Sequence, residues 1–571
     1  MSQNKYNRYM PLLLALCVVI GILIGTFYAN HFSGQRLSII NSGSNKLNTL
    51  LQLIDDQYVD TVNINDLVEG AMPQILSELD PHSVYISAKD VQMANDDLRG
   101  SFSGVGIEFT IRQDTLRVQN VIANGPSERA GVLAGDKIVS VDDKPLVGKE
   151  LTNEEAMHRL KGPKDTQVKL GIVRRGEKNV KYITVTRGEI PVKSISATYM
   201  LNDDTGYIRI KNFGENTYSE MLIALGVLSQ ERFNNLVIDL RGNNGGLLAA
   251  AVRIANEFLP KNSLIVYTEG RKSAREEYVS DGRGAYQHIP LVVLIDEGSA
   301  SAAEILAGAI QDNDRGTIIG RRSFGKGLVQ QPLSFTDGSM IRLTIARYYT
   351  PAGRCIQKPY TSGSDRNYEE DLVTRYQHGE YFSQDSIKHT GPAFYTLRER
   401  RTVYGGGGIT PDIFVPEDTL GMTSYYKEAA MTGLILQFAY EYTDNNRTKL
   451  SAFKDLKSLS AYLDKQNTVE LFASYADSHG LKRRNLLIQK SHKLLERYIN
   501  SRIIYNMMSE QTWTEYLNSD DPVITETLKL FKEGKAFPRN DEQQETGQKK
   551  VARAVFDYRQ THINVTTVAH A

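Results

Sequence analysis

Two glycine-rich segments carry a serine and a lysine whose types suit nucleophilic catalysis. Ser301 lies in the segment GSASA (298–302), which follows an apolar run and opens a predicted helix. The unpaired N–H groups of a helix N-terminus favour negative charge on a group placed there. Lys326 lies between Gly325 and Gly327, and glycines let the backbone approach closely enough for the lysine to enter a crowded site. The two side chains could therefore serve as nucleophile and base in acyl transfer.

The lysine can act as a base only if its amine is neutral at the working pH. Lysine has a reference pKa of about 10.4, and burial in an apolar pocket can lower it by several units. Most lysines are solvated surface residues, so the segment alone does not establish a base. Of the ten histidines, only His288 lies near the serine segment, and its polar surroundings predict exposure. A phosphate-binding loop is excluded because glycine, not Ser or Thr, follows Lys326.

The serine segment permits two other interpretations. Residues 301–304 (SAAE) fit the S-x-x-E capping box, in which the serine only caps the helix. Ser299 is a second candidate nucleophile in the same segment. The segment by itself does not choose between Ser301 as a cap, Ser301 as the nucleophile and Ser299 as the nucleophile.

The elements around these motifs predict a layered core of strands and helices. The runs 236–240 and 291–295 are continuously apolar, which is typical of strands buried on both faces. A glycine-rich turn and a helix follow each run. Residues 189–420 are therefore predicted to form a βα-layered domain of a multidomain α/β protein. Residues 361–403 are polar and predict a surface insertion in this domain.

A β-rich module precedes this core. Residues 99–188 alternate short apolar runs with glycine turns and contain one predicted helix, at 153–160. The segments GVGI (104–107), GPSERAGV (125–132) and GDKI (135–138) resemble PDZ domains of the bacterial type. In such a module, backbone N–H groups hold a chain-terminal carboxylate, and the terminal residues add a strand beside the helix near Met157. The predicted carboxylate-binding residues are Gly104, Val105, Gly106 and Ile107.

The order of the motifs carries a family resemblance. GSASAAEI (298–305), SFGKGLVQ (323–330) and YTPAGR (349–354), after the β-rich module, resemble the C-terminal processing peptidases, also called tail-specific proteases. The resemblance covers roughly residues 79–415. It implies a crotonase-like protease core, a PDZ domain and serine endopeptidase activity that needs no metal or other cofactor. It also implies that Ser301 is the nucleophile and Lys326 the base.

The resemblance implies a third member of the catalytic set, Gln330, which would hold the Lys326 amine by a hydrogen bond. Residues i and i+4 are neighbours on a helical turn, whereas four residues of a strand span about 13 Å. The role of Gln330 therefore requires the chain to be coiled, at least locally, between these two residues.

Acyl transfer also requires N–H donors for the tetrahedral oxyanion. Ala302, directly after the nucleophile, is predicted to supply one. The second is predicted to come from RGNNGG (241–246), which follows a buried strand and whose glycines allow close approach to a substrate. Gly245 is the first choice and Gly246 the second, although a simple glycine turn is nearly as good an explanation for either.

Composition and charge exclude several other classes. Lys+Arg and Asp+Glu both total 67, so no net charge draws the protein to nucleic acid. The two cysteines, Cys17 and Cys355, cannot build a thiolate metal site, and an internal disulfide is not expected because Cys17 lies in an apolar N-terminal run. The predicted partners are protein or peptide substrates that bind through their C-termini.

The apolar run at 11–28 predicts a membrane anchor, since about twenty apolar residues span a bilayer. Lys5 and Arg8 precede it and would keep the N-terminus in the cytoplasm. The expected location is a bacterial inner membrane, crossed once, with the catalytic part in the periplasm. Gly21 and Gly25 form a G-x-x-x-G pair, so a homo-oligomer is possible.

The sequence thus predicts a serine endopeptidase that cleaves exported proteins near their C-termini. The first alternative is an inactive PDZ scaffold that binds C-termini, and the second is a hydrolase that uses Ser299 or a distant histidine. The predicted parts of the chain are a cytoplasmic stub and anchor (1–30), a helical region (31–98), the PDZ domain (99–188), the protease core (189–420), a helical C-terminal domain (421–540) and a flexible tail (541–571).

Overall fold

The computed structural model divides the chain into two compact units, residues 1–76 and 77–571. It describes residues 10–33, 43–112, 114–148, 151–174, 176–177, 179–363, 368, 370–389 and 391–538. The predicted tail at 541–571 and the charged residues before the apolar run lie outside the described residues.

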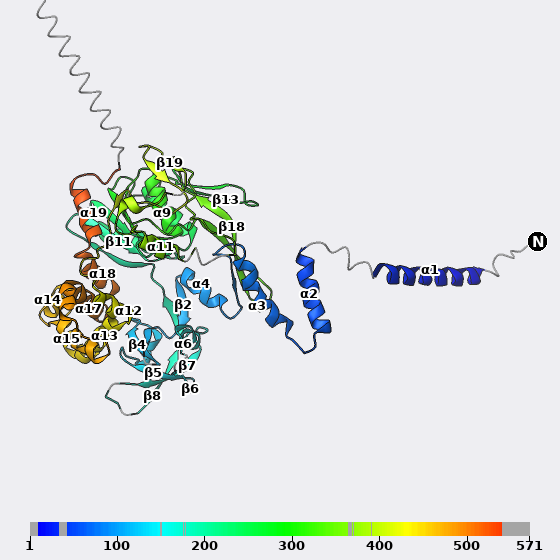
Figure 1. Cartoon of the computed structure of the whole chain (residues 1–571), viewed down its shortest axis with the longest axis horizontal. Helices are drawn as coiled ribbons and strands as arrows, with labels where there is room; N and C mark the ends of the chain where they lie inside the picture. Colours follow the sequence, from blue (N-terminus) through cyan, green and yellow to red (C-terminus); the bar gives the residue numbers. More distant parts are fainter. Residues whose placement is uncertain are drawn as a thin grey trace, which may run out of the picture. The chain divides into compact units, whose positions relative to one another are not determined.

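The first unit is helical, as predicted. Its helices are α1 (Met10–Ser33), α2 (Gly43–Gln57) and α3 (Ile64–Ser77), which ends just beyond the unit boundary (Figure 1). Among the helices that the structure describes, none is both long enough and apolar enough to cross a membrane. The single-pass anchor expected at 11–28 stays a prediction.

The second unit contains the predicted β-rich module. Five antiparallel strands form its sheet in the order β3–β4–β5–β7–β8, and the short strand β6 (Lys144–Pro145) pairs with β5. Two helices complete the module, α5 (Pro126–Ala130) and α6 (Asn153–Leu160), and α6 has the predicted bounds. A short ladder of β2 (Ser101–Gly104) with β9 (Gly188–Pro191) closes the module where the chain enters and leaves it. The five strands are β3 (Ile107–Arg112), β4 (Thr115–Val121), β5 (Lys137–Val141), β7 (Gln167–Val173) and β8 (Lys181–Thr186).

The core is a six-stranded sheet in the order β10–β11–β12–β15–β16–β21. All neighbouring pairs are parallel except β10 with β11. The apolar runs predicted as buried strands are β12 (Asn235–Asp239) and β15 (Leu291–Ile295), the latter with the predicted bounds. The other strands are β10 (Ile195–Met200), β11 (Thr205–Ile210), β16 (Thr317–Gly320) and β21 (Ile413–Phe414).

Helices cover both faces of the core sheet, which explains why its strands are apolar throughout. On one face the buried cluster includes residues of α7 (Thr217–Gln230), α8 (Leu248–Phe258) and α9 (Ala302–Asp312). On the other face, Val237, Val292 and Leu294 pack with Ile524 and Leu530 of α19 (Pro522–Lys532). The last helix of the predicted C-terminal domain is therefore part of the core.

A second sheet adjoins the core and carries the segments after Lys326. Its strands run in the order β1–β18–β13–β14, and β17 (Leu328–Ser334) pairs with β18 (Met340–Tyr349). Strand β1 (Val84–Ile86) comes from the chain before the β-rich module, so this sheet joins segments on both sides of that module. The remaining strands are β13 (Leu264–Glu269) and β14 (Glu276–Val279).

Residues 361–403 are not simply a surface insertion. They include α11 (Asp371–Gln377) and strands β19 (Ala393–Tyr395) and β20 (Thr402–Tyr404). Arg375 and Glu380 are buried, and the Arg375 guanidinium donates to the Ser323 carbonyl. Polar composition predicted exposure for these residues, but they are buried because their charges pair with one another inside the protein.

The C-terminal helices form their own apolar cluster, as predicted, and are grouped together in Figure 1. They are α12 (Ser424–Met431), α13 (Leu434–Leu450), α14 (Leu456–Leu463), α15 (Thr468–Ser478), α16 (Asn485–Lys490), α17 (His492–Met507) and α18 (Glu510–Asn518).

Candidate active site

Ser301 occupies the turn between β15 and α9, where it caps the helix. Its backbone has φ 53° and ψ −113°, in the left-handed half of conformational space. A non-glycine residue held in this way costs on the order of 1–3 kcal/mol, and such strain is found where surrounding contacts enforce it. A serine on a strained turn from a buried strand into a helix has the placement of a nucleophile elbow.

Glu304 ties this turn to the lysine segment. Its carboxylate is fully buried and accepts hydrogen bonds from the Ser301 N–H (2.9 Å) and the Lys326 N–H (2.8 Å), both at Oε2. Its Oε1 accepts from the Ser323 hydroxyl and from the Gly325 N–H (2.7 Å). The backbones of the predicted nucleophile and base are therefore bound to one carboxylate oxygen.

The capping-box interpretation of SAAE was thus correct for Glu304, which reaches back to the Ser301 N–H as that motif requires. The same carboxylate does more than cap the helix. Burial raises the pKa of Glu304 to about 7, while the hydrogen bonds from Ser323 and from the three backbone N–H groups oppose this shift.

Tyr348 of β18 holds the same two residues from the carbonyl side. Its buried hydroxyl lies 3.1 Å from the Ser301 carbonyl oxygen and also contacts the Lys326 carbonyl oxygen. Ser301 and Lys326 are thus joined at their N–H groups through Glu304 and at their carbonyls through Tyr348. The structure thus holds the backbones of the two sequence motifs next to each other.

The surroundings of Lys326 favour a neutral amine. Burial lowers the pKa of Lys326 and Arg342 lowers it further, whereas Glu304 and Asp80 raise it, and the net shift is downward. A lowered pKa is what a lysine base needs near neutral pH. Among the described residues, however, no hydrogen bond joins the Lys326 amine to the Ser301 hydroxyl.

Gln330 lies in a strand, where a contact with Lys326 is not expected. Its side-chain amide donates at 3.4 Å to the Thr344 hydroxyl and to the Leu328 carbonyl. A β-bulge follows Val329 and distorts the strand locally. In the described part of the chain, the structure therefore does not bring Gln330 into hydrogen-bond contact with Lys326.

The glycine loop after β12 packs directly on the serine turn. A Cβ atom added to Gly245 would lie 2.7 Å from Ser301 Cβ and 3.0 Å from the Ala302 nitrogen, so only glycine fits. The Gly245 N–H already donates to Asn243 Oδ1 (2.8 Å). For Ala302 and Gly246, by contrast, the structure gives the backbone N–H no partner among the described residues. Gly245 contacts the serine turn directly, whereas the atoms nearest to Gly246 belong to the Phe213 backbone.

An ion pair anchors the start of this loop. Arg241 binds the buried Asp239 and reaches Asp521 at the N-terminus of α19. Burial opposes ionisation of Asp239, but the Arg241 guanidinium and the Tyr207 hydroxyl hold its pKa at about 2. The loop therefore begins from a charged pair that stays intact at neutral pH.

Ser299 is not placed to act as a nucleophile. It is completely buried, and its hydroxyl donates to the Leu240 carbonyl (2.8 Å) while accepting from the Asp296 N–H (3.0 Å). These contacts join the ends of β12 and β15. We conclude that Ser299 has a structural role.

Sequence reasoning missed one residue beside the lysine. His82 bonds the Tyr368 hydroxyl at 2.8 Å, and burial together with the nearby Lys326 charge lowers the pKa of His82 to about 4. The turn that carries His82 is held by Asp80, whose carboxylate accepts from the Thr344 hydroxyl (3.0 Å). The sequence signal was present only as a turn motif, DPHS (80–83), far from the other motifs.

The predicted carboxylate-binding loop is an ordered turn between β2 and β3. The Val105 carbonyl accepts from the Ser127 N–H (2.9 Å), and the Gly106 carbonyl accepts from the Ile122 N–H (3.1 Å). Gly106 has φ 76°, and a Cβ there would lie 2.8 Å from the Ile190 side chain. The position therefore requires glycine.

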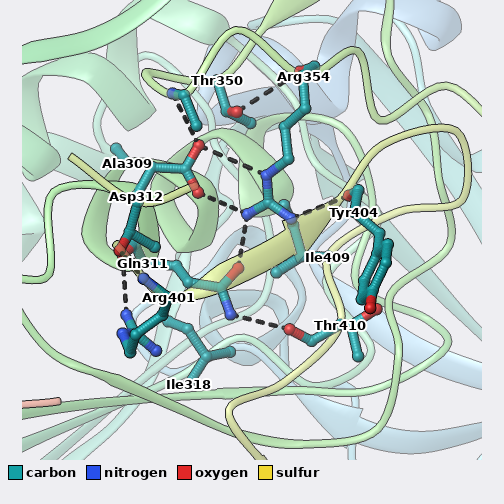
Figure 2. A network of polar contacts seen from close by, with 12 residues as sticks. Ala309, Gln311, Asp312, Ile318, Thr350, Arg354, Arg401, Tyr404, Ile409 and Thr410 are labelled. Atoms are coloured by element: carbon teal, nitrogen blue, oxygen red, sulfur yellow. Dashed lines mark hydrogen bonds and ion pairs between the residues drawn. The ribbon is translucent and has the colours of Figure 1, made fainter. Parts of the chain in front are cut away.

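The arginine of the YTPAGR segment secures the far end of the helix that begins at Ser301. Figure 2 shows Arg354 bound to Asp312 and Gln311, at the C-terminus of α9. Its guanidinium donates to both side chains at 2.6 Å and to the Tyr404 carbonyl at 3.1 Å. Arg354 and Asp312 are fully buried, so this ion pair is removed from water.

Replacement of Arg354 by methionine is expected to destabilise the protein by about 3–5 kcal/mol, because the Asp312 carboxylate is left buried without its partner. The measurement is the shift of the urea midpoint. Arg483→Met, which breaks the solvent-exposed pair with Glu470, is the control and should hardly move the midpoint. Equal shifts for both variants would contradict the argument.

Comparison with known proteins agrees with this geometry. Peptidase family S41 matches residues 204–367, and the PDZ domain matches residues 103–185. The activating protease CtpB N-terminal domain matches residues 30–90, and a family of unknown function matches residues 425–510.

Individual relatives match more than half of the chain. The chain is 37% identical over 359 residues to the carboxy-terminal-processing protease of Bartonella bacilliformis, covering 59% of this chain and 80% of that protein. It is 34% identical to the carboxy-terminal processing protease CtpB of Bacillus subtilis, and this match covers 57% of this chain and 68% of that protein. A solved photosystem II D1 C-terminal processing protease is 26% identical, with a TM-score of 0.34, covering 65% of this chain and 92% of that one.

The βα core, the serine turn and these matches define a serine peptidase that carries a PDZ domain. More specifically, the chain belongs to the carboxy-terminal processing proteases of peptidase family S41. The family resemblance and the fold class predicted from the sequence are thereby confirmed.

Proposed function

We propose that this protease cleaves proteins near their C-termini by means of a dyad of Ser301 and Lys326. The observation that carries the proposal is the pair of hydrogen bonds from the Ser301 and Lys326 N–H groups to one oxygen of Glu304. Both side chains start from backbone positions held in common, and the pKa of the lysine is lowered by burial. The amine and the hydroxyl would come together when substrate binds, as catalytic hydrogen bonds often tighten only in that complex.

The reaction then follows the general course of acyl transfer. The neutral Lys326 amine takes the Ser301 hydroxyl proton while Oγ attacks the peptide carbonyl carbon. The lysine ammonium returns this proton to the departing amine, which leaves an ester on Ser301. Water, deprotonated by the same amine, hydrolyses the ester and restores the serine.

The oxyanion of the tetrahedral intermediate would be stabilised by the backbone N–H groups of Ala302 and Gly246. Both are unpartnered within the described residues, whereas Gly245 must first release Asn243 Oδ1. The free N–H favours Gly246, whereas direct packing against Ser301 favours Gly245, the first choice from the sequence. Gln330 keeps its proposed role only if its side chain leaves Thr344 and turns toward the lysine.

Substrate capture is assigned to the PDZ module. The loop Gly104–Val105–Gly106–Ile107 would hold the terminal carboxylate, and the terminal residues would lie between β3 and α6. The predicted periplasmic location of the catalytic part stays a prediction, to be tested by cell fractionation.

The capture step predicts a difference between two forms of one substrate. A peptide with a free C-terminal carboxylate should be cleaved about 10-fold or more faster than the same peptide with a C-terminal amide, because the loss of a charged hydrogen-bonded group costs about 1.5–3 kcal/mol. Mass spectrometry of the products over time gives both rates and identifies the cleaved bond.

The same experiment distinguishes an active protease from an inactive scaffold. If neither peptide is cleaved but the free carboxylate still binds, the chain is an inactive scaffold that captures C-termini. If both are cleaved equally fast, the enzyme is active and the capture step is refuted. Ser301→Ala serves as the control for contaminating proteases.

A further inference from the structure

Three side chains of metal-binding type gather where helix α6 meets the segment before α4 (Val91–Arg99). Glu154 and His158 lie one turn apart on α6, and Asp90 directly precedes α4. One ligand atom from each residue lies within 4.8 Å of the other two. None of the three belongs to the serine–lysine site, and both elements are visible in Figure 1.

The spacing of the histidine and aspartate ligand atoms matches a zinc site. His158 Nε2 lies 3.4 Å from Asp90 Oδ1 and 3.9 Å from Glu154 Oε1. Nitrogen and oxygen ligands at about 2.0–2.1 Å from Zn²⁺, arranged tetrahedrally, lie about 3.3–3.4 Å from one another. The aspartate and histidine already have this separation. The three ligand atoms lie within 4.8 Å of one another, so the Glu154 side chain, which is 66% exposed, would have to move toward the other two ligands.

The hydrogen bonding of the Asp90 carboxylate is a second observation at this place. The Asp90 side chain is 28% exposed, but its Oδ1 atom is buried and accepts no hydrogen bond among the described residues, with only the His158 ring nitrogen 3.4 Å away. The other oxygen accepts a hydrogen bond from the Ser87 hydroxyl, which fixes the orientation of the carboxylate. A buried oxygen without a donor is unfavourable, and a cation at this place would satisfy it. A partner that orients a ligating carboxylate is a regular feature of metal sites.

We propose that Asp90, Glu154 and His158 bind one divalent transition-metal ion, with Zn²⁺ as the best match. Imidazole with carboxylate ligands suits zinc, whereas Ca²⁺ and Mg²⁺ prefer all-oxygen sites. Three protein ligands leave the fourth tetrahedral position to water, which can reach the site past the exposed Glu154. The ion would tie α6, one wall of the proposed peptide groove, to the start of α4.

The test is a titration of the full chain, stripped with a chelator, with ZnCl₂ in a calorimeter. We expect one saturable site per chain. His158→Ala and Asp90→Asn should weaken binding by at least about 100-fold, and Ser87→Ala by about 10-fold. Titration with Co²⁺ should give visible absorption bands that these ligand variants lose.

Glu155→Gln is the matched control, because Glu155 lies beside Glu154 on α6 but pairs with Arg159 instead. It should bind Zn²⁺ as the wild type does. Circular dichroism checks that each variant is folded, and Glu154→Gln, at an exposed position, tests the site even if a buried variant does not fold. Absence of saturable binding in the wild type, or equal binding in wild type and His158→Ala, would reduce the cluster to a histidine ion pair and overturn the proposal.

Discussion

Ser301→Ala and Lys326→Ala are each expected to lower kcat/KM by at least about 10³–10⁴-fold, and the double variant should be no worse than either single one. A nucleophile and its base act as one unit, so the removal of one also removes the catalytic contribution of the other. The Glu304 carboxylate, which binds both backbones, makes this coupling plausible on structural grounds. Initial rates on a fluorogenic peptide measure the effect.

Lys529→Ala is the control for the lysine, since Lys529 is an exposed residue paired with Glu526. Its activity should equal that of the wild type. If the double variant lost kcat/KM by the product of the two single losses, Ser301 and Lys326 would act independently, and the dyad would have to be abandoned. Full activity of Lys326→Ala would point to another base.

The dyad also has a consequence for stability. The pKa of Lys326 is lower in the folded chain than in the unfolded chain, chiefly because of burial. The unfolded chain therefore binds more protons between the two pKa values, and stability should rise with pH across that interval. Lys326→Met should lose this rise, and at neutral pH it should be at least as stable as the wild type although inactive.

Glu304→Gln is expected to lower kcat/KM by about 10²-fold or more. The carboxylate accepts hydrogen bonds from four donors, and an amide would turn an N–H₂ group toward some of them. The Ser301 turn and the Lys326 backbone would then move apart, and a displacement of about 1 Å costs rates of this size. Glu304→Asp keeps the charge but is shorter, and should recover part of the activity.

The pKa of Glu304 gives this prediction a pH signature. Burial raises the pKa to about 7 in the folded chain, from its ordinary value of 4.5. The stability that protonated Glu304 contributes is complete below about pH 4.5 and is lost as the pH rises through about 7, on the order of 3 kcal/mol in all. Urea midpoints measured from pH 4.5 to 8 should show this decline in the wild type but not in Glu304→Gln.

Glu257→Gln provides the control. Glu257 is also buried, but it accepts a hydrogen bond from Tyr218, and neither residue belongs to the proposed active site. It should change stability and leave kcat nearly unchanged. If both glutamine variants lose activity in proportion to their lost stability, Glu304 has only a general structural role. Loss of kcat in a stable Glu304→Gln protein would support its positioning role.

Much of the fold could be predicted because its signals are local. Continuous apolar residues gave β15 its correct bounds, and the capping pattern placed the start of α9 next to Ser301. For the opposite reason, the sequence did not predict that parts of the polar stretch 361–403 are buried. Its buried arginine and glutamate are stable only because they meet each other and Ser323, and composition does not reveal such pairing.

The candidate site shows the same division. The sequence determined which residues could react, since Ser301, Lys326 and the glycines are set by residue type and by turns of a few residues. Only the tertiary structure decided that Glu304 and Tyr348 join these segments, and that the Gly245 N–H donates to Asn243. Direction of a backbone N–H and contact between distant segments depend on packing of the whole core, which no local pattern encodes.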